Sequence, residues 1–224
     1  MKNVLAMETS GDFCTVGLLL DGNRFHIHEH VDKRHNERLL PLLGDLISMA
    51  GISRAELIGN LHAVAFGRGP GSFTGVRIAA AAAQALALAA GARVLRVGSS
   101  EILAEGVLRK VPAAPGVVTS IRSRRDLHYL ATWRNIEGVP MVEQRDQLHA
   151  ESPDAAFYEH CEGWPVAGET PGWWRGPAPL PHRPDGDDLL TAAIRCLSRG
   201  EDVDPSQALP EYLSGDSPWR KVRP

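Results

Sequence analysis

A glycine-rich segment between residues 69 and 75 has the composition of a loop that holds a phosphate group. Its sequence is Gly-Pro-Gly-Ser-Phe-Thr-Gly, and it lies between an apolar strand and an alanine-rich helix. Glycine lets the backbone approach a partner closely, and Ser72 and Thr74 can cap the helix, whose first N–H groups favour an anion. The same features suit a tight turn that only packs the helix on the sheet. The spacing leaves both interpretations open.

The two best-known phosphate motifs do not match this loop. The Walker A motif requires a lysine directly after its last glycine, whereas Gly75 is followed by Val76 and Arg77. The dinucleotide fingerprint is G-x-G-x-x-G, and the glycines at 69, 71 and 75 have one residue too many between the second and the third.

Three segments together resemble a known family. The loop resembles the G-P-G-S-F-T-G-[LV]-R-I motif of the TsaB family, also called YeaZ, and Leu5–Ser10 resembles that family's opening L-A-[IFM]-[DE]-T-S. Residues 33–41, Lys-Arg-His-Asn-Glu-Arg-Leu-Leu-Pro, are similar to its R-x-H-[SN]-E-x-L-L-P motif. The matches are dense over the first ~110 residues and weak beyond them.

The resemblance implies an α/β fold of the actin-like ATPase, Hsp70 and sugar kinase type, with two lobes that each hold a mixed sheet flanked by helices. We expect residues 1–110 to form the N-terminal lobe with partner-binding helices. Residues 111–224 then form a smaller and more divergent C-terminal lobe, and the stiff connector 111–115 marks the boundary. From the residues alone, the pattern supports only a mixed α/β lobe.

The predicted elements follow from apolar periodicity and from turn residues. Asp21-Gly22-Asn23 indicates a hairpin turn, and Pro41 should kink the first helix or delay its start beyond Asn36. A proline- and tryptophan-rich stretch, 163–187, is expected to be irregular. The predicted strands are 4–8, 13–20, 24–31, 63–67, 94–97, 116–121, 127–134 and 141–143, and the predicted helices are 36–50, 74–90, 99–108 and one that begins at 187.

The family resemblance also suggests a nucleotide pocket, either functional or vestigial, and the alternative is an ordinary polar strand end. In actin-like ATPases the end of the first strand supplies a carboxylate and hydroxyls that meet Mg²⁺ and phosphate, and here Glu8, Thr9 and Ser10 take that place. Gly71 and Ser72 of the loop complete the candidate set. A carboxylate beside a phosphate turn could hold a hydrated Mg²⁺, but the loop lacks a lysine, so we expect no tightly bound cofactor in the chain alone. ATP and Mg²⁺ then act at the level of a complex.

Histidines offer little support for a metal centre. His26, His28 and His30 share one face of a predicted strand, but the outer two lie about 13 Å apart if the strand is extended, too far for one ion. A solvated polar face is the expected explanation. TsaD, the transferase that is the catalytic paralogue in this family, carries an H-x-x-x-H iron site on the helix after the fifth strand. The matching residues 98–104 of this chain contain no histidine.

Composition limits the classes of partner. With 24 basic and 27 acidic residues among 224, the net charge of −3 argues against a protein that wraps nucleic acid alone. The three scattered cysteines suggest buried, reduced thiols and a cytoplasmic location. We expect neither a signal segment nor a membrane span.

The resemblance implies a scaffolding role in tRNA threonylcarbamoyladenosine modification, at adenosine 37 of tRNAs that decode ANN codons. The chain would bind and support TsaD together with the ATPase TsaE, contact tRNA only through that complex, and form a homodimer in the absence of TsaD. No independent activity is expected. The alternative is an ATP-dependent kinase or hydrolase of the actin-like superfamily that uses Glu8 and the Gly69–Gly75 loop. A metallopeptidase is a third interpretation, which the missing histidine motif opposes.

The helix predicted at 74–90 is apolar nearly all round, which suggests cover on two sides. In the resembled family this helix and the first helix form the subunit interface. We expect its outward alanines, taken as Ala80, Ala83 and Ala87, to meet a partner, with Leu40 and Met49 extending the patch. Alternatively, the C-terminal segment folds back over the helix.

Overall fold

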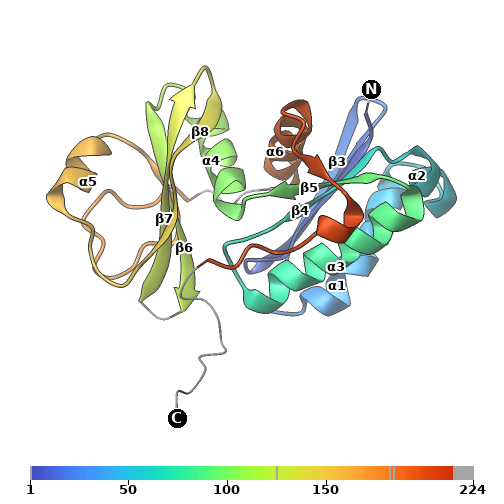
Figure 1. The fold of residues 1–224 in the computed structure, drawn as a ribbon, viewed down its shortest axis with the longest axis horizontal. Helices are drawn as coiled ribbons and strands as arrows, with labels where there is room; N and C mark the ends of the chain where they lie inside the picture. Colours follow the sequence, from blue (N-terminus) through green and yellow to red (C-terminus); the bar gives the residue numbers. More distant parts are fainter. Residues whose placement is uncertain (1, 125, 182, 184, 214–224) are drawn as a thin grey trace, which may run out of the picture.

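The chain forms two β-sheets with helices around them, as Figure 1 shows. The structure is a computed structural model of the 224-residue chain, and it describes residues 2–124, 126–181, 183 and 185–213. The first sheet has six strands and the second has four.

The first sheet has the strand order β10-β5-β4-β1-β2-β3. Strands β1 (Val4–Glu8), β2 (Phe13–Leu20) and β3 (Asn23–His30) form an antiparallel meander, and β4 (Ala63–Gly67) and β5 (Arg93–Val97) run parallel to β1. The five strands predicted in this part of the chain are all present within one residue at each end. Because β1 and β4 are parallel neighbours, Glu8 and Gly67 end at the same edge of the sheet.

Helices cover both faces of this sheet because the buried strands are apolar on both sides. Leu5 and Met7 of β1 face the core shared with α1 (His35–Met49) and α3 (Phe73–Ala90), whereas Val4 and Ala6 face α6 (Gly186–Ser198). The short α2 (Arg54–Asn60) lies beside α3. Helix α1 begins at His35 and continues through Pro41, so the expected later start was wrong.

The second sheet has the order β8-β7-β6-β9. Its strands are β6 (Gly116–Arg124), β7 (Leu127–Ile136), β8 (Val139–His149) and β9 (Val166–Gly168), with the short helix α5 (Ala155–His160) between β8 and β9. Strand β8 extends well past the predicted 141–143. The prediction was too short because the second half of the strand is polar and has no apolar pattern. Most of its side chains are exposed at the sheet edge.

Helix α4 (Ser99–Lys110) lies between the two sheets and is buried from Ser99 to Leu108 (Figure 1). It contacts β6 and β8 on one side and α6 on the other. Two ion pairs connect it to α6 and the residue after α6. Glu105 Oε2 lies 2.9 Å from Arg195 Nε, and Glu101 Oε1 lies 2.9 Å from Arg199 Nη2. Burial raises the pKa of Glu105, and the Arg195 guanidinium opposes that effect.

After α6 the chain crosses back along the first sheet. Strand β10 (Asp202–Val203) pairs with β5, and the single turn η1 (Pro205–Gln207) packs against α3. The proposed division at residue 110 stays a prediction, and the structure adds that α6, β10 and η1 contact the first sheet and its helices.

The outward face of α3 differs from the sequence prediction. Ala80, Ala83 and Ala87 are at most 4% exposed, because they and Val76 and Ala79 face the sheet and η1. The exposed positions follow a helical period displaced by one residue. They are Thr74, Arg77, Ala81, Ala85, Leu88 and Ala89.

A carboxylate of the second lobe is buried against the start of α4. Ser100 donates a hydrogen bond of 2.6 Å to Asp146 Oδ2, whereas Asp146 Oδ1 has no partner among the described residues. Burial raises the pKa of Asp146 to about 6, the Ser100 bond lowers it, and the nearby Glu211 carboxylate raises it. Ionisation of Asp146 therefore costs folding stability.

We predict that Asp146→Asn stabilises the protein at neutral pH. The unfolded pKa is 3.8 and the folded value is about 6, so the cost is absent below pH 3.8, grows between the two values and is complete above pH 6. Relative to the wild type, the free energy of unfolding should increase by about 1–3 kcal/mol on going from pH 4 to pH 8. Urea unfolding at both pH values measures this change. Glu151→Gln, on an exposed loop, should show no such pH-dependent gain.

Candidate functional site

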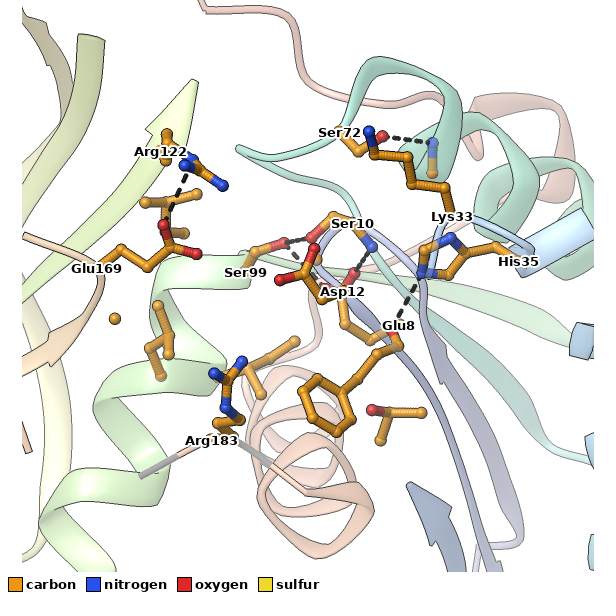
Figure 2. Close-up of a pocket in the computed structure, with 18 of the residues that line it drawn as sticks. Glu8, Ser10, Asp12, Lys33, His35, Ser72, Ser99, Arg122, Glu169 and Arg183 are labelled. Atoms are coloured by element: carbon orange, nitrogen blue, oxygen red, sulfur yellow. Dashed lines mark hydrogen bonds and ion pairs between the residues drawn. The ribbon is translucent and has the colours of Figure 1, made fainter. Parts of the chain in front are cut away.

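A cavity of about 850 Å³ lies between the two sheets, at the carboxyl ends of the parallel strands (Figure 2). Its walls come from the end of β1 and the turn after it, the glycine loop, the starts of α1, α3 and α4, strand β6, and the loops around 169 and 181. The polar residues in this wall include Glu8, Ser10, Asp12, Lys33, Ser72, Ser99, Arg122, Glu169 and Arg183.

Glu8 is held at the floor of this cavity by two hydrogen bonds. Its Oε1 accepts the backbone N–H of Ser10 at 2.5 Å, and its Oε2 accepts the hydroxyl of Ser99 at 2.9 Å. The carboxylate also lies directly over Gly67, where a Cβ atom would overlap it. Position 67 therefore tolerates no side chain while Glu8 keeps this place.

The glycines of the loop let it pack tightly against the turn after β1. A Cβ atom on Gly75 would overlap the carbonyl oxygen of Thr9, and one on Gly71 would lie 2.5 Å from Ser10 Cβ. Thr9 Oγ1 donates to the Gly75 carbonyl at 2.7 Å, and the Ser72 N–H donates to the Ser10 carbonyl at 2.7 Å. The glycines therefore allow the loop to approach the turn after β1 closely, and these contacts are made within the protein.

Ser72 caps α3, as the sequence predicts. Its Oγ accepts the N–H of Gly75 at 3.3 Å. Thr74, the other suggested cap, lies within the helix and is exposed. The structure thus brings Glu8, Ser10, Gly71 and Ser72 together around the turn, with Thr9 buried behind it.

Several residues of the cavity were not predicted as site residues, although Lys33 is the first residue of the 33–41 motif. Lys33, Arg122 and Arg183 reach it from separate loops and a strand end, and Glu169 lies 3.3 Å from Arg122. Phe13 stacks on His28 with ring centroids 4.2 Å apart. These positions are far apart in the sequence and meet only through the folded topology, so their common place in one cavity could not be read from the local motifs.

The polar groups at the end of β1 are bonded to one another within the protein and not left open toward the cavity. Of the residues that the sequence suggested for phosphate, Ser10 donates its N–H to Glu8 and Ser72 donates its N–H to the Ser10 carbonyl, while Ser99, which the sequence did not suggest, donates its hydroxyl to Glu8. Within residues 2–213, apart from the undescribed positions, no group of three His, Cys, Asp or Glu side chains is placed to hold a metal. His28 bonds to Thr15 Oγ1 at 2.7 Å.

A buried serine–histidine pair faces the same cavity but is not arranged as a nucleophile and its base. Ser120 Oγ donates to the Glu169 carbonyl and lies 3.1 Å from His128 Nδ1. Because the single hydroxyl proton goes to the carbonyl, His128 must be the donor in the second bond. Burial lowers the pKa of His128, which favours the neutral ring. The pair therefore stabilises the β6–β7 contact.

The cysteines are also structural. Cys14, Cys161 and Cys196 are buried, as expected, and burial raises their pKa values to about 12, 11 and 12. At neutral pH these thiols stay protonated and unreactive.

Comparison with known proteins identifies the family. The model of the family "TsaD: tRNA N6-adenosine threonylcarbamoyltransferase" matches residues 27–152. The Escherichia coli tRNA threonylcarbamoyladenosine biosynthesis protein TsaB is 31% identical over 232 aligned residues, which cover 98% of this chain and 97% of that protein. The chain belongs to the TsaB family.

Two further relatives agree with this membership. The Haemophilus influenzae TsaB is 35% identical over 133 residues, 58% of this chain and 54% of its own length. Among solved structures, YeaZ from Pseudomonas aeruginosa superposes with a TM-score of 0.80 at 32% identity, over 95% of this chain and all of that one. The α/β fold with two lobes of the actin-like type is therefore the fold of this TsaB-family member.

The packing of the glycine loop predicts that alanine substitutions at two glycines change the free energy of unfolding in opposite directions. Gly75→Ala should lower the free energy of unfolding by about 2–4 kcal/mol, because the new methyl group overlaps the backbone of Thr9, which cannot rotate away. Gly44→Ala, in α1, meets no atom within 4 Å and should raise stability by about 0.5–1 kcal/mol. Chemical denaturation of both variants measures the difference. Equal effects of the two changes would contradict the packing role of Gly75.

Proposed function

We propose that this chain acts in tRNA threonylcarbamoyladenosine biosynthesis, as a non-catalytic subunit that binds and supports a TsaD transferase. The observation that carries the proposal is the match to the Escherichia coli TsaB over nearly the full length of both chains. The modification is made at adenosine 37 of tRNAs that decode ANN codons. TsaE joins the complex, tRNA is reached through it, and the protein works in the cytoplasm.

The chemistry of the cavity supports a non-catalytic role. Glu8, Ser10 and Ser99 satisfy one another, and Ser120 and His128 stabilise the second sheet. A general base must reach the proton that it removes, whereas the hydrogen bonds of these groups in this structure are made to other groups of the protein. The alternative of a kinase or hydrolase that uses Glu8 and the Gly69–Gly75 loop gains no support from this arrangement.

The proposed partner surface is the outer face of α1 and α3, which lie side by side on the first sheet (Figure 1). Three large apolar side chains are exposed there: Leu40 at 67%, Met49 at 55% and Leu88 at 65%. Ala81 and Ala85 lie on the outer face of α3, and small side chains permit a second helix to approach closely. We propose that a TsaD homologue, or a second copy of this chain when TsaD is absent, covers this face.

The C-terminal segment covers a different side of α3. Gln84 donates to the Pro205 carbonyl at 3.1 Å, and the Arg77 guanidinium lies over the rings of Phe73 and Tyr212, which contact each other. This contact leaves Ala85 and Leu88 exposed. Intramolecular cover and a partner surface therefore occupy separate parts of the helix.

We predict that Ala85→Arg weakens binding of the TsaD homologue from the same cell by at least tenfold. The substitution places an unpaired charge in an apolar contact, while the exposed position allows the monomer to fold. Ala156→Arg, an equally exposed alanine on α5, is the matched control and should bind normally. Titration calorimetry with purified TsaD measures both. Normal binding by folded Ala85→Arg would place the partner surface elsewhere.

We also predict that Glu8→Ala leaves assembly with TsaD largely intact, because Glu8 lies in the cavity and not on the outer face of α1 and α3. Co-purification should recover the complex at the wild-type ratio. If Glu8→Ala formed the complex yet abolished tRNA modification, the enzymatic alternative would be favoured.

A further inference from the structure

An anion of the protein itself, the Glu8 carboxylate, binds hydrogen-bond donors at the cavity that could otherwise receive a phosphate group. The turn after β1 offers a backbone N–H at Ser10, and the first residue of α4 offers the hydroxyl of Ser99. Both donate to the carboxylate of Glu8. Backbone N–H groups in a turn, together with a hydroxyl at a helix start, are the donors that bind phosphate in other proteins.

We propose that the Glu8 carboxylate is the resident anion of this site, and that it excludes phosphate-bearing ligands from the cleft. Removal of its charge then uncovers a site for the phosphate class of anion. The proposal does not depend on a role in tRNA modification. It depends only on the geometry around Glu8 in the cavity described above.

The first support is that the floor of the cavity is shaped around the carboxylate. Gly67 has no side chain, and a Cβ atom there would lie less than 3 Å from the carboxyl carbon and both carboxylate oxygens of Glu8. Parallel pairing of β1 with β4 fixes the two residues at one edge of the sheet. The backbone therefore presents a space that the Glu8 carboxylate fills.

The second support is that the hydroxyls around the carboxylate are bonded to one another. Ser99 Oγ donates to Glu8 and lies 3.0 Å from Ser10 Oγ, so its remaining capacity is to accept the Ser10 proton. An incoming phosphate would have to displace Glu8 from Ser10 and Ser99 together. It would also meet the negative charge at a distance of a few ångströms, where repulsion corresponds to about tenfold or more in affinity.

The cavity wall also carries a positive charge, Lys33, that could attract a phosphate group once the Glu8 carboxylate is removed. Figure 2 shows Lys33 beside Ser72, on the side of the cavity where α3 begins. Asp12 lies on the same turn as Ser10 but is exposed. It therefore supplies a control for the effect of charge alone.

The proposal and the enzymatic alternative predict opposite effects of one substitution. If Glu8 were a ligand of Mg²⁺–ATP, its loss would weaken nucleotide binding. If Glu8 fills the site, its loss creates binding. The sign of the change separates the two mechanisms, whatever the outcome of the TsaD experiments.

The test is calorimetric titration of inorganic pyrophosphate, and separately of Mg²⁺–ATP, into the wild type, Glu8→Gln, Glu8→Ala and Asp12→Asn. We expect the wild type to bind pyrophosphate only weakly, Glu8→Gln at least tenfold more tightly, and Glu8→Ala more tightly still. Asp12→Asn should change the affinity less than threefold. A crystal structure of Glu8→Ala with pyrophosphate should place a phosphate oxygen within hydrogen-bond distance of the Ser10 nitrogen.

Three results would overturn the proposal. One is tight binding by the wild type that Glu8→Gln removes, and another is an equal gain from Asp12→Asn, which would indicate a general effect of charge. The third is a folded Glu8→Gln protein with no gain in affinity. Glu8→Gln keeps the shape of the side chain, so it preserves the test if Glu8→Ala fails to fold, and thermal unfolding checks the fold of each variant.

Discussion

The close contact of three chain segments at the end of β1 is the constraint on which the rest of this structure depends. The turn at Thr9 and Ser10, the glycine loop and the start of α4 approach so closely that two glycines have no room for a methyl group. Glu8 joins the turn to α4 through Ser10 and Ser99. Strand β1, helix α3 and the helix between the sheets are thereby fixed relative to one another.

Helix α4 carries this constraint to the second sheet. It is buried along ten residues, and its ion pairs to Arg195 and Arg199 attach it to α6, which covers the other face of the first sheet. The two carboxylates are largely buried and the arginines are partly exposed; such pairs add little net stability but are costly to break singly, so they favour one arrangement of α4. The two lobes are thus held by contacts within the protein, which suits a subunit that presents a fixed outer surface to a partner.

The sequence predicted strands β1 to β5 of the first sheet well, because apolar runs and turn residues mark most of their ends, but it missed the short elements α2 and β10. It also predicted the Ser72 cap and the exposure of Leu40 and Met49. The phase of α3 was wrong by one residue, since a nearly uniform alanine helix has no polar stripe to mark its outer face. The polar half of β8, and the positions of Lys33 and Glu169 in the cavity, depend on tertiary contacts that no local pattern records.

Membership of the TsaB family and the internal bonding of the cavity support our central proposal, that this chain supports threonylcarbamoyl transfer without performing it. The most direct measurement is reconstitution with the TsaD and TsaE homologues of the same cell, a threonylcarbamoyl donor, ATP and unmodified tRNA, with mass spectrometry of the digested tRNA. The account predicts no threonylcarbamoyladenosine with this chain alone and strong formation only when it is combined with TsaD. Modified tRNA produced by this chain without TsaD would contradict the account, as would full activity of TsaD and TsaE in its absence.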